Sequence, residues 1–111
     1  MASQDSNVML LILHRLEPGC LGPDGADHVE QFCQLAEKAI QGLAPEVCQW
    51  QLVPRFDKSL PEMSYFLGSK QLTKEQTDRY LEMFSLEIDE FEERFHAKLT
   101  QLINQYLARK G

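Results

Sequence analysis

The side chains best suited to chemistry lie in, and just after, a glycine- and proline-rich segment, residues 16–26. This segment contains the thiol of Cys20, and His28 follows it closely in the sequence. A cysteine beside a helix N-terminus and a histidine can be partly ionised and act as a nucleophile. Cys20 and His28 are therefore the candidate catalytic residues. In the alternative interpretation, Cys20 is a small apolar filler of a tight turn.

The same segment is also the candidate site for a small ligand. It joins an expected strand to an expected helix over 11 residues, whereas such connections usually have about 2 to 6. Free backbone N–H groups at a helix N-terminus attract anions. The candidate ligand-binding residues are Glu17, Gly22, Asp24 and Asp27. The carboxylates among them oppose an anionic ligand, and in the alternative interpretation they only cap the helix and face solvent.

Other patterns argue against further chemistry. Glu93 and His96 put two types of metal ligand on one helix face, as in di-iron carboxylate proteins. Those sites need a second such pair, which this sequence lacks, so no metal and no cofactor are expected. The turn at Gly68 lacks the upstream glycine of a phosphate-binding loop.

The charge balance excludes two broad classes of partner. The formal net charge is −6 over 111 residues, whereas a general binder of nucleic acid or of anionic membranes needs a basic surface. Trp50, Tyr65 and Phe66 could stack on bases, but few cations accompany them, so we expect them in the core. The longest apolar run, residues 8–13, is far shorter than the roughly 20 residues that span a bilayer.

Cysteine usage and the first residues bear on location and domain organisation. The cysteines are Cys20, Cys33 and Cys48, an odd number without a CxxC motif, which argues against a disulfide scaffold or a zinc ribbon and favours the cytoplasm. Residues 1–6 contain no Lys or Arg for a signal peptide and are expected to be a disordered polar tail. Residues 7–111 are expected to form a single domain.

Hydrophobic periodicity predicts three strands and two helices. The strands are residues 7–14, 47–53 and 62–68, and the helices are residues 28–43 and 74–110. This order predicts a small α+β sandwich, an incomplete ferredoxin-like pattern with a long C-terminal helix. The first strand is apolar on both faces and is expected to be covered on both sides, in part by a partner subunit.

The helix boundaries carry their own signals. Asp27 is the expected N-cap of the first helix, and Thr73 with Gln76 forms a capping box before the second. Residues 74–110 contain no Gly or Pro, so the simplest expectation is one unbroken helix. Its apolar stripe is spaced by three and four residues, close to a coiled-coil seam. The stripe consists of Leu81, Phe84, Ile88, Phe91, Phe95, Leu99, Leu102 and Tyr106.

An unbroken helix of this length predicts self-association. It would span about 52 Å, whereas a compact domain of this size has a diameter of about 34 Å. The overhanging stripe must then be covered by a second chain, unless the helix bends back near Ser85. The candidate interface residues are Leu99, Leu102 and Tyr106.

Charge separates along the same helix. Residues 75–93 contain eight acids and one base, a net charge of −7, whereas residues 94–111 contain four bases and no acid. This split favours antiparallel pairing, with each acidic half beside the other chain's basic half. In the alternative interpretation, the charges form pairs within one solvated helix, such as Glu75–Arg79 and Glu90–Arg94.

The sequence therefore predicts a small, soluble homodimer of the cytoplasm that is not an enzyme. It is expected to act as an interaction or regulatory module, with a protein partner and without nucleic acid or membrane. The alternative is a small-molecule-binding domain or a Cys-dependent enzyme that uses residues 16–28.

Overall fold

The first strand, β1 (Leu10–Leu16), separates a buried face of the sheet from an uncovered one. Leu10 and Ile12 are buried, while Leu11 and Leu13 are only half-buried. Successive side chains of a strand point to opposite faces. The helices therefore cover one face of the sheet, and the other face keeps partly exposed leucines.

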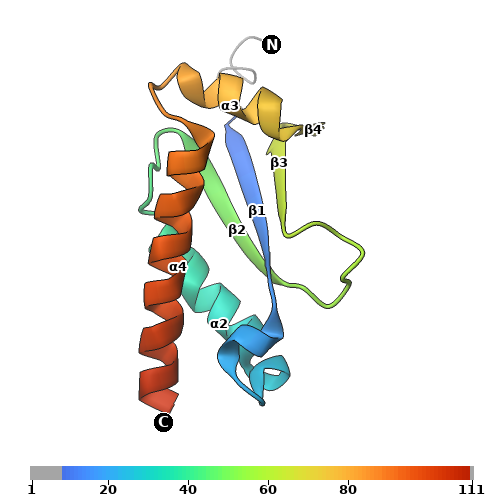
Figure 1. Cartoon of the computed structure of the whole chain (residues 1–111), viewed down its shortest axis with the longest axis vertical. Coiled ribbons are helices and arrows are strands. Elements are labelled where there is room, and N and C mark those ends of the chain that lie inside the picture. Colours follow the sequence, from blue (N-terminus) through green and yellow to red (C-terminus); the bar gives the residue numbers. More distant parts are fainter. Residues whose placement is uncertain (1–8, 111) are drawn as a thin grey trace.

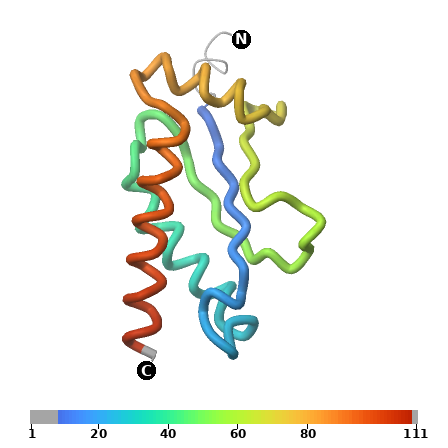
Figure 2. The backbone as a smooth tube through the Cα atoms, viewed as in Figure 1, coloured from blue at the N-terminus to red at the C-terminus, as the bar shows by residue number. Residues whose placement is uncertain are grey.

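Figures 1 and 2 show the computed structural model, which describes residues 9–110 and places the C-terminal helix alongside a mixed sheet. The predicted α+β class is confirmed. The predicted order strand-helix-strand-strand-helix is found with two differences: a fourth strand follows the third, and the last helix is divided into two. Asn7 and Val8, which the sequence assigned to the first strand, lie outside the described residues, as does the expected tail. The strand itself ends two residues later than predicted, at Leu16.

The sheet has the strand order β2-β1-β3-β4. The strand β2 (Cys48–Pro54) runs parallel to β1, and β3 (Met63–Leu67) runs antiparallel on its other side. A short strand that the sequence did not predict, β4 (Lys70–Leu72), pairs with β3. Because β1 and β2 are direct neighbours, no strand splits the crossover unit, which distinguishes this sheet from the ferredoxin-like pattern.

The first connection is shorter and more ordered than expected. It contains a short 3-10 helix, η1 (Pro18–Leu21), and the helix α2 (Gly25–Ile40) begins directly after it. The prediction that Asp27 caps this helix is wrong: Asp24 occupies the N-cap position, because the Asp27 N–H already donates to the Asp24 carbonyl. A Cβ atom on Gly25 would lie 1.7 Å from the Pro18 carbonyl oxygen, so the early start requires glycine.

The expectation of one unbroken C-terminal helix is also wrong, because the chain turns at Ser85. That residue has a φ of 61°, in the left-handed region, and separates α3 (Lys74–Glu82) from α4 (Ile88–Lys110). The Asp78 carboxylate accepts a hydrogen bond from the Ile88 N–H at 3.0 Å, which supports the start of the second helix. The predicted capping box at the start of α3 is confirmed.

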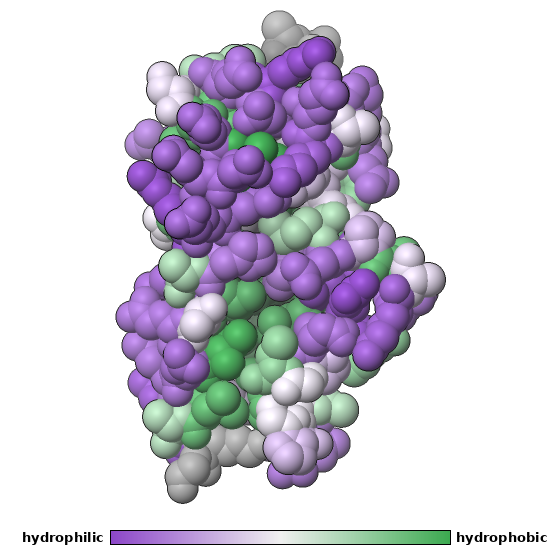
Figure 3. Space-filling view, viewed as in Figure 1, coloured by the Kyte–Doolittle hydropathy of each residue, from purple (hydrophilic) through white to green (hydrophobic). Residues whose placement is uncertain are grey.

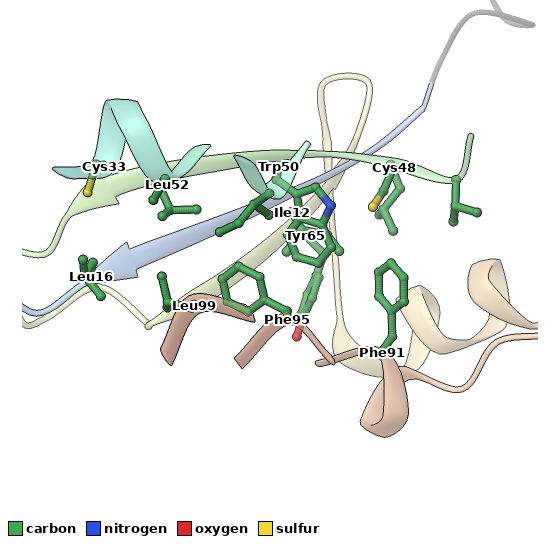
Figure 4. Close-up of a cluster of buried hydrophobic side chains, with 14 of the residues drawn as sticks. Ile12, Leu16, Cys33, Cys48, Trp50, Leu52, Tyr65, Phe91, Phe95 and Leu99 are labelled. Carbon is green, nitrogen blue, oxygen red and sulfur yellow. The ribbon is translucent and has the colours of Figure 1, made fainter. Parts of the chain in front are cut away.

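The turn lets α4 cover the sheet of its own chain. Figure 4 shows Phe91, Phe95 and Leu99 pointing from this helix toward the strands. Phe95 stacks on Trp50, with ring centroids 4.8 Å apart, and Leu99 is only 5% exposed. Most of the predicted stripe is therefore buried within one chain, while its end at Leu102 and Tyr106 is half-buried.

The outer edge of β2 is covered by side chains of the segment that precedes it. The Gln41 side chain accepts a hydrogen bond from the Trp50 N–H at 3.2 Å and donates one to the Trp50 carbonyl. The Glu37 carboxylate accepts a hydrogen bond from the Leu52 N–H at 2.8 Å. Pro54 is the last residue of this edge strand, a position that tolerates proline.

Candidate functional site

The two candidate catalytic residues lie on neighbouring elements. Cys20 is exposed on η1. His28 is half-buried on α2, with its ring centroid 6.4 Å from that of Tyr106 on α4. The structure thus brings a candidate catalytic histidine beside a candidate interface residue. Catalysis by Cys20 and His28 stays a prediction.

The candidate ligand-binding residues take different places in the connection. Glu17 lies 3.4 Å from the Lys58 ammonium and 4.0 Å from the Arg55 guanidinium, so its carboxylate links the loops that follow β1 and β2. Gly22 has a φ of 94°, a conformation that favours glycine. Asp24 is at the N-cap of α2, and Asp27 is exposed in its first turn.

A buried histidine on β1 is a feature that sequence reasoning did not assign. His14 is 3% exposed, and its Nδ1 atom lies 3.0 Å from the Met63 sulfur. Its ring packs edge-on against Phe95 and lies 5.9 Å from that of the exposed His96. Burial, helped by the charges of His96 and Arg55, lowers the pKa of His14 to about 4. His14 is therefore neutral inside the core at physiological pH.

Metal chemistry finds no support in the described part of the chain. Across residues 9–110, no group of three or more His, Cys, Asp or Glu side chains is arranged to hold a metal ion. His96 of the Glu93–His96 pair points to the surface. Within the same residues, no helix is long and apolar enough to cross a membrane.

The first uncovered surface is the open face of the sheet. Leu11 and Leu13 lie along its centre, and Phe66 lies beside them on β3; all three are half-buried. Gln49 and Gln51 of β2 are exposed on the same face. The surface is therefore an apolar strip with amide neighbours.

A second uncovered surface is a groove between α2 and the C-terminal half of α4, which we call the basic groove. It has a volume of about 210 Å³ and is lined by Phe32, Leu35, Ala36, Leu102, Gln105, Tyr106 and Arg109. Phe32 and Ala36 are buried and form its floor, whereas Leu35 is 54% exposed at its rim. Figure 3 shows hydrophobic side chains gathered beside this half of α4. Two candidate interface residues, Leu102 and Tyr106, thus lie in one groove.

A third surface is the turn between α3 and α4, residues 82–87, which we call the acidic turn. Met83 is 75% exposed and Phe84 is 40% exposed. The sequence placed Phe84 in the buried stripe; this is wrong because the break at Ser85 turns it outward, against Tyr80. Glu82 and Glu87 are exposed beside these apolar side chains.

The ion pairs of the described residues leave the two ends of α4 with opposite unpaired charges. Lys74 pairs with Asp89 and Glu92, and the predicted Glu75–Arg79 pair forms at 3.0 Å. The other predicted pair, Glu90–Arg94, is not formed in residues 9–110. In this part of the chain, Glu82 and Glu87 of the acidic turn form no ion pair, and neither do the bases Lys38, Arg94, Lys98 and Arg109.

Comparison with protein-family models, with curated proteins and with solved structures finds no match to this chain.

Proposed function

We propose that this protein is a non-enzymatic interaction module that works as a soluble homodimer in the cytoplasm. The observation that supports the proposal is the pair of uncovered surfaces at the two ends of α4. One end is apolar and acidic, with Met83 75% exposed; the other is apolar and basic, with Leu35 54% exposed. Exposed apolar patches of this type mark interaction sites.

The distribution of charge along α4 favours a second copy as the partner. A net charge of −6 makes two copies repel one another in most orientations. The repulsion becomes attraction only when the basic half of one α4 lies beside the acidic half of the other. Complementary charge of this kind selects the orientation and the partner.

The candidate interface residues do not contribute equally. Leu99 is 5% exposed and is already buried by its own chain, so it offers little surface to a partner. Leu102 and Tyr106 are half-buried and line the basic groove. We therefore assign the contact to these two residues and to Leu35.

The alternative function, a small-molecule-binding domain or a Cys-dependent enzyme, rests on the exposed thiol of Cys20. The basic groove is smaller than the roughly 300 to 1,000 Å³ of typical small-molecule pockets, so it favours side chains as the occupant.

Sedimentation equilibrium at micromolar concentrations tests the proposal. We expect a mass that rises from 12.8 kDa toward twice that value as the concentration increases. Salt at about 1 M should weaken the dimer only mildly, because a buried leucine contributes about 1.5 to 3 kcal/mol and an exposed ion pair at most about 1. A monomer at every concentration would refute the homodimer.

A further inference from the structure

We propose that the acidic turn of each copy fills the basic groove of the other, so that two antiparallel α4 helices are joined by two identical contacts. The inference rests on the proposed homodimer and names its interface. The two surfaces lie at opposite ends of one helix, α4 (Ile88–Lys110), and this placement supports the inference.

The apolar side chain of the acidic turn suits the apolar lining of the basic groove. Met83 is the most exposed of the large hydrophobic side chains in residues 9–110. The groove offers it the ring of Tyr106, which lies edge-on to that of Phe32 with centroids 5.2 Å apart. Methionine fills irregular apolar gaps and makes favourable contacts between its sulfur and aromatic rings. The groove therefore suits this side chain.

The charges around the two surfaces are opposite. Glu82 and Glu87 flank the turn, and Arg109 lines the groove. Lys38 is exposed on α2, one helical turn beyond Leu35. Within residues 9–110 these four side chains form no ion pair. The contact gives each of the two acids a nearby cation.

The turn is already held in one conformation. Its backbone donates hydrogen bonds from Phe84 to Leu81 at 2.9 Å and from Leu86 to Leu81 at 3.0 Å. The ring of Phe84 leans on that of Tyr80, with centroids 5.4 Å apart. A segment that is ordered before binding loses little conformational entropy when it docks.

The geometry of α4 allows both contacts to close at once. Its 23 residues span about 35 Å at 1.5 Å each, and the two surfaces lie at opposite ends. A two-fold axis near the middle of the helix places each turn beside the other copy's groove. A contact of this kind is closed and stops at two copies.

A charge-swap experiment tests this pairing. Leu35→Glu places an acid in the groove, and Met83→Lys places a base on the turn; both side chains are more than half exposed, so the fold should tolerate the changes. Each variant alone should dimerise at least about tenfold more weakly than the wild type. Mixed together, they should form a heterodimer near wild-type affinity, because the wild-type turn enters the wild-type groove and the new Lys meets the new Glu.

Sedimentation equilibrium measures the affinities, and native mass spectrometry identifies the heterodimer by its mass. Circular dichroism checks that each variant is folded. Leu60→Glu is the matched control, since Leu60 is 43% exposed on the loop between β2 and β3 and should leave the dimer unchanged.

The outcomes separate this inference from the proposed function. A monomeric wild type refutes the homodimer itself. If the wild type dimerises and both variants dimerise equally well, the homodimer stands and the turn-in-groove contact is wrong, which points to the open sheet face. If each variant alone is monomeric and the mixture forms no heterodimer, the contact is also refuted. A mass that grows beyond the dimer would refute the two-fold closure.

Discussion

The indole of Trp50 and the ring of Phe95 lie almost parallel, 4° apart, with a centroid separation of 4.8 Å. Phe91 stacks on the same indole at 5.4 Å. The indole Nε1–H donates to the Leu43 carbonyl at 2.9 Å, so its polar edge is satisfied as well. This stack joins the edge strand β2 to α4, and it fixes the helix whose two ends carry the proposed contacts.

Removing one ring of the stack should destabilise the whole domain. Phe95→Ala leaves a cavity under Trp50 and is expected to lower the free energy of unfolding by about 3 to 5 kcal/mol. Urea denaturation measures the loss. Phe56→Ala is the control, because Phe56 is 61% exposed and its removal should change stability by less than about 0.5 kcal/mol. Equal effects of the two substitutions would contradict a central role for the stack.

The start of α2 should not tolerate any side chain at position 25. Gly25→Ala forces its Cβ atom against the Pro18 carbonyl, so η1 and the helix must separate. The expected loss of stability is about 1 to 3 kcal/mol, as for overpacked sites, and thermal unfolding would reveal it. Gly19→Ala is the matched control, since nothing lies within 4 Å of a Cβ atom there. A wild-type melting temperature for Gly25→Ala would show that the close approach is not required.

Stability should fall as the pH drops from 6.5 to 4. The pKa of His14 is lowered to about 4 in the folded chain from an ordinary value of 6.5, so between these values the unfolded state binds more protons. Unfolding is then favoured by acid, by up to about 1.4 kcal/mol per pH unit, and the loss is complete below pH 4.

The variant His14→Leu isolates this effect, because it removes the group and leaves His96 and Arg55 in place. Urea midpoints measured across the pH range should show a shallower dependence for the variant than for the wild type. The same slope in both proteins would mean that another group controls the acid sensitivity.

The three cysteines should differ in reactivity. Burial raises the pKa of the Cys33 thiol to about 11, with the charges of Glu37 and Glu30 adding to the effect, and burial raises that of Cys48 to about 12. Brief alkylation of the folded protein near neutral pH should therefore label Cys20 alone, as peptide mass spectrometry would show. The unfolded chain, labelled under the same conditions, is the reference. If Cys20 reacts no faster in the folded protein, the Cys-dependent alternative loses its basis.

Local sequence signals were sufficient for much of the fold. The hydrophobic periodicity of residues 47–53 predicted β2, because this signal acts within a few residues. The capping box of Thr73 and Gln76 predicted the start of α3 for the same reason.

The features that the sequence did not reveal depend on contacts between distant residues. Ser85 has no intrinsic preference for a left-handed conformation, and the helix after it is supported by Asp78 of the preceding helix. His14 is buried in contact with Met63, which is 49 residues away in the sequence. The basic groove exists only because α2 and α4 meet, so only Leu102 and Tyr106 could be anticipated as residues of that surface.

The side chain of Gln41 has a consequence for the behaviour of the chain in concentrated solution. The Gln41 amide accepts a hydrogen bond from the Trp50 N–H and donates one to the Trp50 carbonyl. It therefore takes the place that the peptide group of a neighbouring strand would occupy. Glu37 blocks the next free N–H, and the opposite edge of the sheet is only the short β4. Unpaired strand edges are the templates for aggregation. A foreign strand must displace both side chains before it can add to β2, so copies can gather at high concentration without growing into a continuous sheet.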